Sequence, residues 1–179
     1  MEPNSGDAEI NHRIQISFLK LNELSNLLQN FQINLKARVK FLNRFVRSRL
    51  TYACQNWNIT QTQFDRIDAT YRTFLRRMIR NGMKHVNEAE NDFRMLISNV
   101  RLHEICGTMD VSVFIKNQQR NYVAHVIRMS VHRNVKKLTF NDDKNTRRGR
   151  PVRSLLEQVM ANENLSVDGM CNFALKMKR

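Results

Sequence analysis

The sequence is poor in the residues that interrupt helices. Its 179 residues include only five Gly and two Pro. Because Gly and Pro mark turns and break helices, their scarcity favours long helical segments. No stretch shows the sustained alternation of apolar and polar residues that predicts a half-buried strand. We therefore expect a mainly α fold, a thumb-like helical bundle followed by a smaller helical segment and a basic loop.

Cysteine and long apolar runs are scarce as well. The three cysteines, Cys54, Cys106 and Cys171, are odd in number and lack the paired spacing of a zinc site or disulfide framework. The N-terminal residues are polar and acidic with no apolar run behind them, which indicates no secretory signal. No apolar stretch approaches the length of a membrane span. These absences predict an intracellular chain, nuclear or cytoplasmic, with reduced thiols and no membrane segment.

Patterns that carry catalytic chemistry are also missing. The five His have no metal-ligand spacing, and the five scattered Gly form no phosphate-binding loop. Residues 140–143, Phe-Asn-Asp-Asp, imitate the aromatic-x-Asp-Asp box with which reverse transcriptases hold two metal ions. That chemistry requires a third carboxylate from a separate strand, whereas this pair runs straight into a cationic loop. We interpret it as a solvated acidic pair and expect no enzyme activity from this chain alone, no metal and no cofactor.

What the sequence does have is positive charge in two blocks. The net charge is +14, and residues 34–80 and 116–153 each hold eleven Lys or Arg against two acids. One interpretation is a generally basic, solvated surface. Clustering favours the other, a footprint for a polyanion such as nucleic acid.

The first block is expected to place cations in a row on one helix. Apolar residues recur at helical spacing over 10–28, and Asn34 is a plausible N-cap for a second helix that runs to about residue 53. Steps of four, four and three residues place four cations on one face of this second helix: Lys36, Lys40, Arg44 and Arg47. Like charges so aligned repel one another, so the row indicates a polyanionic ligand more than a role in folding.

A second row follows on the next helix. Thr60 and Gln63 match a capping box, and Ile59 with Phe64 is suited to a hydrophobic staple, so we expect a helix from about residue 61 to a stop at Gly82. Its exposed side carries a further set of cations: Arg72, Arg76, Arg80 and, beside them, Arg77.

The second block ends in a charged loop. Residues 83–110 are expected to form short helices and loops, followed by one helix over 111–129 and another over about 152–160. Between these helices Arg147 precedes Arg148-Gly149-Arg150-Pro151, whose extended core could enter a narrow minor groove. The other interpretation is a flexible basic loop, and either would touch phosphates through Arg147, Arg148 and Arg150. The expected division is a disordered lead-in over 1–9, a bundle over 10–82, a linker over 83–138, and a basic loop, short helix and tail over 139–179.

Five phrases, taken together and in order, resemble the region downstream of the polymerase core in non-LTR (LINE-type) retrotransposon reverse transcriptases. They are INHRI (10–14), RSRLTYACQNW (47–57), LRRMI (75–79), YVAHVIRM (122–129) and RRGRP (147–151). The resemblance covers roughly residues 10–160. It implies that 10–82 is the helical thumb that closes on the template–primer duplex, and that the segment after it guides template RNA or target DNA.

The sequence departs from this family at several places. Ala53 and Gln55 stand where the family has Gly and Glu, and Ala124 stands where it has Gly. The fingers and palm are not in this sequence, so the resemblance implies that the catalytic carboxylates are absent and that polymerase activity would need a palm in trans.

The functional hypothesis is therefore a non-catalytic fragment of a reverse transcriptase that binds RNA, DNA or a hybrid, mainly through phosphates. It predicts that reversing the charge of Arg72 and Arg76 abolishes nucleic-acid binding and leaves the helices intact. The alternatives are a helical protein–protein adaptor whose cationic faces dock an acidic partner, and a transposon relic without function.

Overall fold

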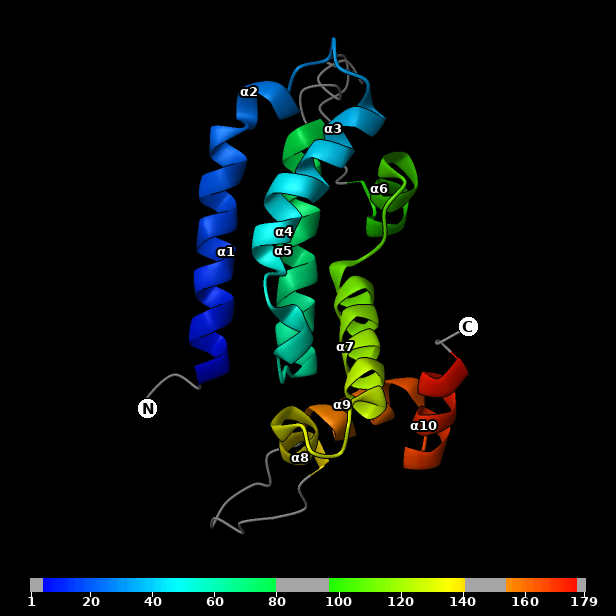
Figure 1. Cartoon of the computed structure of the whole chain (residues 1–179). Coiled ribbons are helices and arrows are strands. Elements are labelled where there is room, and N and C mark those ends of the chain that lie inside the picture. Colours follow the sequence, from blue (N-terminus) through cyan, green and yellow to red (C-terminus); the bar gives the residue numbers. More distant parts are fainter. Residues whose placement is uncertain (1–4, 80–96, 141–153, 177–179) are drawn as a thin grey trace. The chain divides into compact units, whose positions relative to one another are not determined.

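The computed structural model describes residues 5–79, 97–140 and 154–176, and within these ranges the chain is mainly helical with no strand (Figure 1). This confirms the expected mainly α, bundle-like fold. Contacts between residues divide the chain into two compact units. The first comprises the described residues up to 52 and those of 59–113, and the second comprises 53–58 and those from 114 onward.

The first unit is built on three helical rods. They are α1 (Ser5–Glu23), the continuous run of α3 (Leu35–Phe41), η1 (Leu42–Arg47) and α4 (Ser48–Leu50), and α5 (Gln61–Ile79). The short α2 (Ser25–Leu28) joins the first two rods, and α6 (Asn99–Cys106) packs on α5 and α3. Consecutive rods alternate in direction in Figure 1, and α1 packs on both of the others.

Local capping sets where these helices begin, as the sequence predicts. Oδ1 of Asn34 accepts a hydrogen bond from the backbone N–H of Lys36 at 2.8 Å, so Asn34 is the N-cap of α3. At the start of α5, the backbone N–H of Thr60 donates to Oε1 of Gln63 at 2.8 Å, and the N–H of Gln63 donates to Oγ1 of Thr60 at 3.4 Å. The capping box is therefore confirmed. The predicted stop at Gly82 lies outside the described residues, and the described part of α5 runs to Ile79.

The N-terminal helix begins earlier than predicted. We expected a disordered lead-in over residues 1–9, but α1 starts at Ser5. Oδ1 of Asp7 accepts a hydrogen bond from Nε2 of Gln63 at 2.6 Å, which ties the first turn of α1 to the first turn of α5. The sequence alone did not show this partner, because the two residues are far apart along the chain.

The second rod contains a π-helical segment, η1, that keeps one stripe of residues buried. An ideal α-helix turns about 40° too far over four residues, so a run of four-residue steps drifts around its surface. Leu42, Val46 and Leu50 are separated by four residues each, yet all three are fully buried. The wider turn of η1 offsets the drift, so the stripe stays against α1.

The core of the first unit centres on α5. Ile67, Phe74 and Leu75 are fully buried, and the ring of Phe18 from α1 meets that of Phe74 edge-on with centroids 4.9 Å apart. The predicted apolar face of the first helix is present, since Ile10, Leu21 and Leu28 are buried. These contacts fix the exposed sides of all three rods, and thereby the positions of the candidate site residues.

The second unit contains η2 (Cys54–Asn56), α7 (Val111–Arg128) from Phe114 on, α8 (Asn134–Phe140), α9 (Leu155–Glu163) and α10 (Val167–Lys176). Its apolar cluster is formed by Val123, Val159 and Met170. α7 matches the predicted helix over 111–129. α9 begins after Ser154, which forms a capping box with Glu157, rather than at residue 152. His125, on α7, is exposed.

Two of the predicted boundaries between segments of the chain can be compared with the described residues. The junction of 82 and 83 lies outside the described residues, and the junction of 138 and 139 lies inside α8. No helix in the described ranges combines the length and hydropathy needed to cross a membrane.

Tyr71 gives the first unit a predicted sensitivity to alkali. Its phenol is fully buried and donates a 2.6 Å hydrogen bond to Oδ1 of Asn43. Burial raises the pKa of Tyr71 from 10.0 to about 12. The folded state therefore holds the phenolic proton more tightly than the unfolded state. Stability from this residue is fully present below about pH 10 and is lost as pH rises toward 12, at about 1.4 kcal/mol per pKa unit.

We expect Tyr71→Phe to be less stable than the wild type at neutral pH by about 1 kcal/mol, because a buried hydrogen bond is lost. Above about pH 10 this difference should shrink and then reverse, since the variant has no phenol to titrate. Urea unfolding followed by circular dichroism across this range measures the change. A difference that stays constant with pH would contradict the assignment.

Candidate nucleic-acid interface

Three of the four cations predicted on the helix after Asn34 are exposed, namely Lys36, Lys40 and Arg44, and we call them the cationic face. No acid of the described residues forms an ion pair with any of them. The surrounding sequence offers little neutralisation, because residues 24–64 contain six Lys or Arg and neither Asp nor Glu. The cationic face is therefore a concentration of positive charge available to a ligand.

The backbone explains why these three side chains stay aligned. Lys36 and Lys40 lie in α3, and Arg44 lies in η1. The wider turn that keeps Leu42 and Leu50 on the buried side also limits the rotation between Lys40 and Arg44 on the exposed side.

Arg47, the fourth predicted member, is placed differently. It is half-buried, and it lies close enough to Tyr71 for its charge to oppose the rise in pKa that burial causes there. Arg47 therefore faces α5 and is not a free member of the row.

Two members of the predicted row on α5, Arg72 and Arg76, make contacts within the fold. Nη1 of Arg72 forms an ion pair with Oδ1 of Asp110 at 2.7 Å. Nη2 of Arg76 donates to the carbonyl oxygen of Ile97 at 3.2 Å and to Oδ1 of Asn99 at 2.7 Å. Both arginines thus hold the 97–110 segment against α5.

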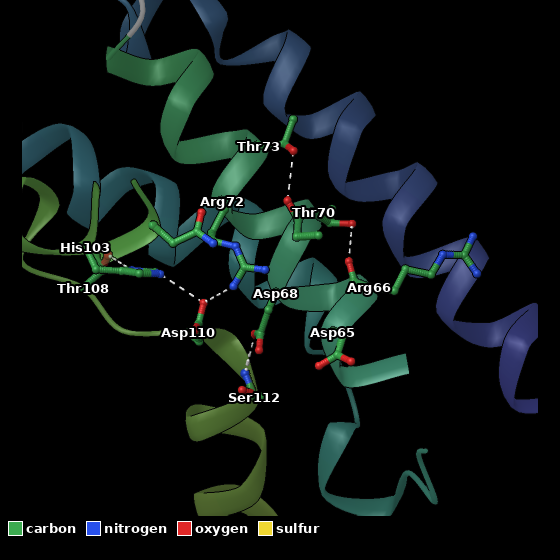
Figure 2. A network of polar contacts seen from close by, with 12 residues as sticks. Asp65, Arg66, Asp68, Thr70, Arg72, Thr73, His103, Thr108, Asp110 and Ser112 are labelled. Atoms are coloured by element: carbon green, nitrogen blue, oxygen red, sulfur yellow. Dashed lines mark hydrogen bonds and ion pairs between the residues drawn. The ribbon is translucent and has the colours of Figure 1, made fainter. Parts of the chain in front are cut away.

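Figure 2 shows that the Arg72 pair belongs to a larger polar network. Oδ1 of Asp110 also lies 3.0 Å from Nε2 of His103, whose Nδ1 lies 3.1 Å from Oγ1 of Thr108. Reversing the charge at Arg72 would place a carboxylate against Asp110. We therefore expect the double reversal with Arg76 to disturb the packing of the 97–110 segment as well, so that pair does not test binding cleanly.

Asp68 extends this network to the next helix (Figure 2). Its Oδ1 accepts a 2.8 Å hydrogen bond from the backbone N–H of Ser112, in the first turn of α7. Burial raises the pKa of Asp68, and the hydrogen bonds from Ser112 act in the opposite direction. The carboxylate satisfies an N–H group that a helix start leaves without a partner.

The remaining predicted cations fall into two groups. Arg77 is exposed, with its guanidinium 5.2 Å from the centroid of the Phe18 ring, a cation–π contact between α5 and α1. The others lie outside the described residues: Arg80, Arg147, Arg148 and Arg150.

Several cations of the second basic block stabilise their own unit. Nη1 of Arg120 lies 3.3 Å from Oε2 of Glu163, and Nη1 of Arg128 donates to the carbonyl oxygen of Ala174 at 3.0 Å. Nζ of Lys136 donates to the carbonyl oxygens of Ile127 and Met129, near the C-terminus of α7, where a positive charge is favourable. The number of Lys and Arg in this block therefore overestimates how many are available to bind a ligand.

Sequence reasoning missed Arg38. This arginine lies between the exposed cations in the sequence but is only 6% exposed. Its Nη1 donates to the carbonyl oxygens of Leu28 and Met78, at 3.1 and 3.2 Å. Leu28 is the last residue of α2 and Met78 lies in the last described turn of α5, so the guanidinium joins α2 to α5.

Sequence reasoning also missed two exposed aromatic residues. Phe41 and Phe45 are 38% and 40% exposed, and each directly follows a member of the cationic face, Lys40 or Arg44. The sequence did contain a sign of their exposure, because neither residue falls on the apolar stripe that this helix buries. Their rings are nearly parallel, with centroids 6.2 Å apart.

The described residues hold no cluster of three or more His, Cys, Asp or Glu side chains that could bind a metal ion. Comparison with protein families, curated proteins and solved structures finds no match to this chain.

Proposed function

We propose that this chain binds nucleic acid by holding its phosphate backbone on the cationic face. The observation that carries the proposal is the alignment of Lys36, Lys40 and Arg44 on one exposed side, without a neutralising acid in the described structure. Three aligned, unpaired cations repel one another, and a polyanion relieves that repulsion while releasing its own counterions.

We further propose that the chain corresponds to the thumb and linker of a non-LTR reverse transcriptase, and acts without a palm of its own. Ala53 supports this, because its backbone has φ 57°, the left-handed region that favours the glycine of the family phrase. Two of the segments that resemble the family, 10–14 and 47–57, also contact each other. The guanidinium of Arg13 lies 4.6 Å from the centroid of the Tyr52 ring. Under this proposal a polymerase core in trans is a second partner.

Binding to labelled oligonucleotides of two unrelated sequences tests the nucleic-acid proposal. We expect similar affinities for both sequences, with a loss of at least tenfold when salt rises from about 50 to about 200 mM. Fluorescence anisotropy of the full chain measures both. No binding at the lower salt concentration would contradict the proposal.

A competition experiment distinguishes nucleic-acid binding from the alternative function, an adaptor that binds an acidic protein. We expect polyglutamate, at equal charge concentration, to displace the oligonucleotide poorly, because its carboxylates lack the spacing and phosphate oxygens of the backbone. Displacement as effective as that by unlabelled oligonucleotide would favour the adaptor.

A further inference from the structure

The cationic face has an aromatic edge, formed by Phe41 and Phe45. Their ring planes are within 13° of parallel. The residues lie four apart on one helical run, so both rings are presented from the same side of the rod. Each residue is more than a third exposed, although both lie next to buried residues of the core, Leu42 and Val46.

The charge around these rings restricts the partner that would cover them. An apolar protein surface placed on Phe41 and Phe45 would also desolvate Lys40 and Arg44, which have no ion pair in the described structure. A regular nucleic-acid duplex would satisfy the cations but not the rings, because its base faces are already stacked inside the helix. A strand with unpaired bases satisfies both, since it offers phosphates and free aromatic faces together.

We propose that Phe41 and Phe45 form a stacking platform for unpaired bases of single-stranded nucleic acid, whose phosphates lie on Lys40 and Arg44. Parallel rings suit successive bases of one strand, which are themselves parallel when stacked. This inference rests on the proposed nucleic-acid binding and adds a preference for strands with free bases. It requires no sequence preference, because every base has an aromatic face.

The test uses three labelled probes of equal length, about twelve nucleotides, chosen to separate stacking from phosphate binding. They are oligothymidylate, an abasic oligonucleotide with the same phosphates, and a duplex. The wild type should bind oligothymidylate at least tenfold more tightly than the abasic probe. The variant Phe41→Leu/Phe45→Leu keeps apolar bulk but removes both aromatic faces. It should lose roughly tenfold on oligothymidylate and change less than twofold on the abasic probe.

Tyr52→Leu is the matched control, because Tyr52 is another exposed aromatic residue of the same unit, and the Arg13 guanidinium occupies one face of its ring. It should bind all three probes as the wild type does. Equal wild-type binding to oligothymidylate and the abasic probe would overturn the stacking platform while leaving phosphate binding in place. That comparison needs no variant, so it decides the matter even if the double substitution unfolds the chain. Failure to bind any probe would instead overturn the proposed function.

Discussion

Replacing Lys36, Lys40 and Arg44 together with Gln should lower nucleic-acid affinity by roughly 100- to 1000-fold at about 0.1 M salt, because each lost phosphate contact removes nearly one released counterion. The three side chains are exposed and have no ion pair in the described ranges, so the helices should be unchanged. Anisotropy titration measures the affinity, and circular dichroism measures the helical content.

The control for this variant removes the same amount of charge elsewhere. Arg66, Arg101 and Lys176 are exposed cations outside the cationic face. Replacing these three with Gln gives the same net charge, but the affinity should fall by less than about tenfold, since only long-range attraction is weakened. Equal losses in both variants would mean that net charge, rather than the aligned row, governs binding.

The second large effect concerns Arg38. Replacing it with Met is expected to lower the free energy of unfolding by about 3 kcal/mol, because two buried hydrogen bonds from a charged donor are lost. Met retains much of the apolar part of the arginine side chain. Most of the decrease in the free energy of unfolding is therefore due to the lost guanidinium. Urea unfolding followed by circular dichroism measures the change.

Arg44→Met is the matched control, because Arg44 lies on the same helical run but is exposed. Its stability should stay within about 0.5 kcal/mol of the wild type. If Arg38→Met were equally mild, the guanidinium would not be an important link between α2 and α5.

The sequence predicted those features that depend on neighbours in the chain. The N-cap at Asn34, the capping box of Thr60 with Gln63 and the helix over 111–129 are all confirmed. Each is encoded within a few residues, so spacing and residue type are enough to identify it.

Features set by distant contacts were not predictable in the same way. Spacing placed Arg72 and Arg76 on an outer row, but their partners Asp110 and Asn99 come from a segment more than twenty residues away. Spacing gave no sign that Arg38 is buried, because the carbonyls it binds belong to two other helices. A helical period shows which residues share a face, whereas the packing of the other helices decides what covers that face.

The salt dependence of binding tests the central claim most directly. A plot of the logarithm of the binding constant against the logarithm of salt concentration has a slope near −0.7 to −0.9 per phosphate neutralised. If Lys36, Lys40 and Arg44 each contact a phosphate, replacing all three with Gln should make the slope shallower by about two to three. Parallel lines for the wild type and this variant would contradict the assignment of the cationic face as the nucleic-acid interface.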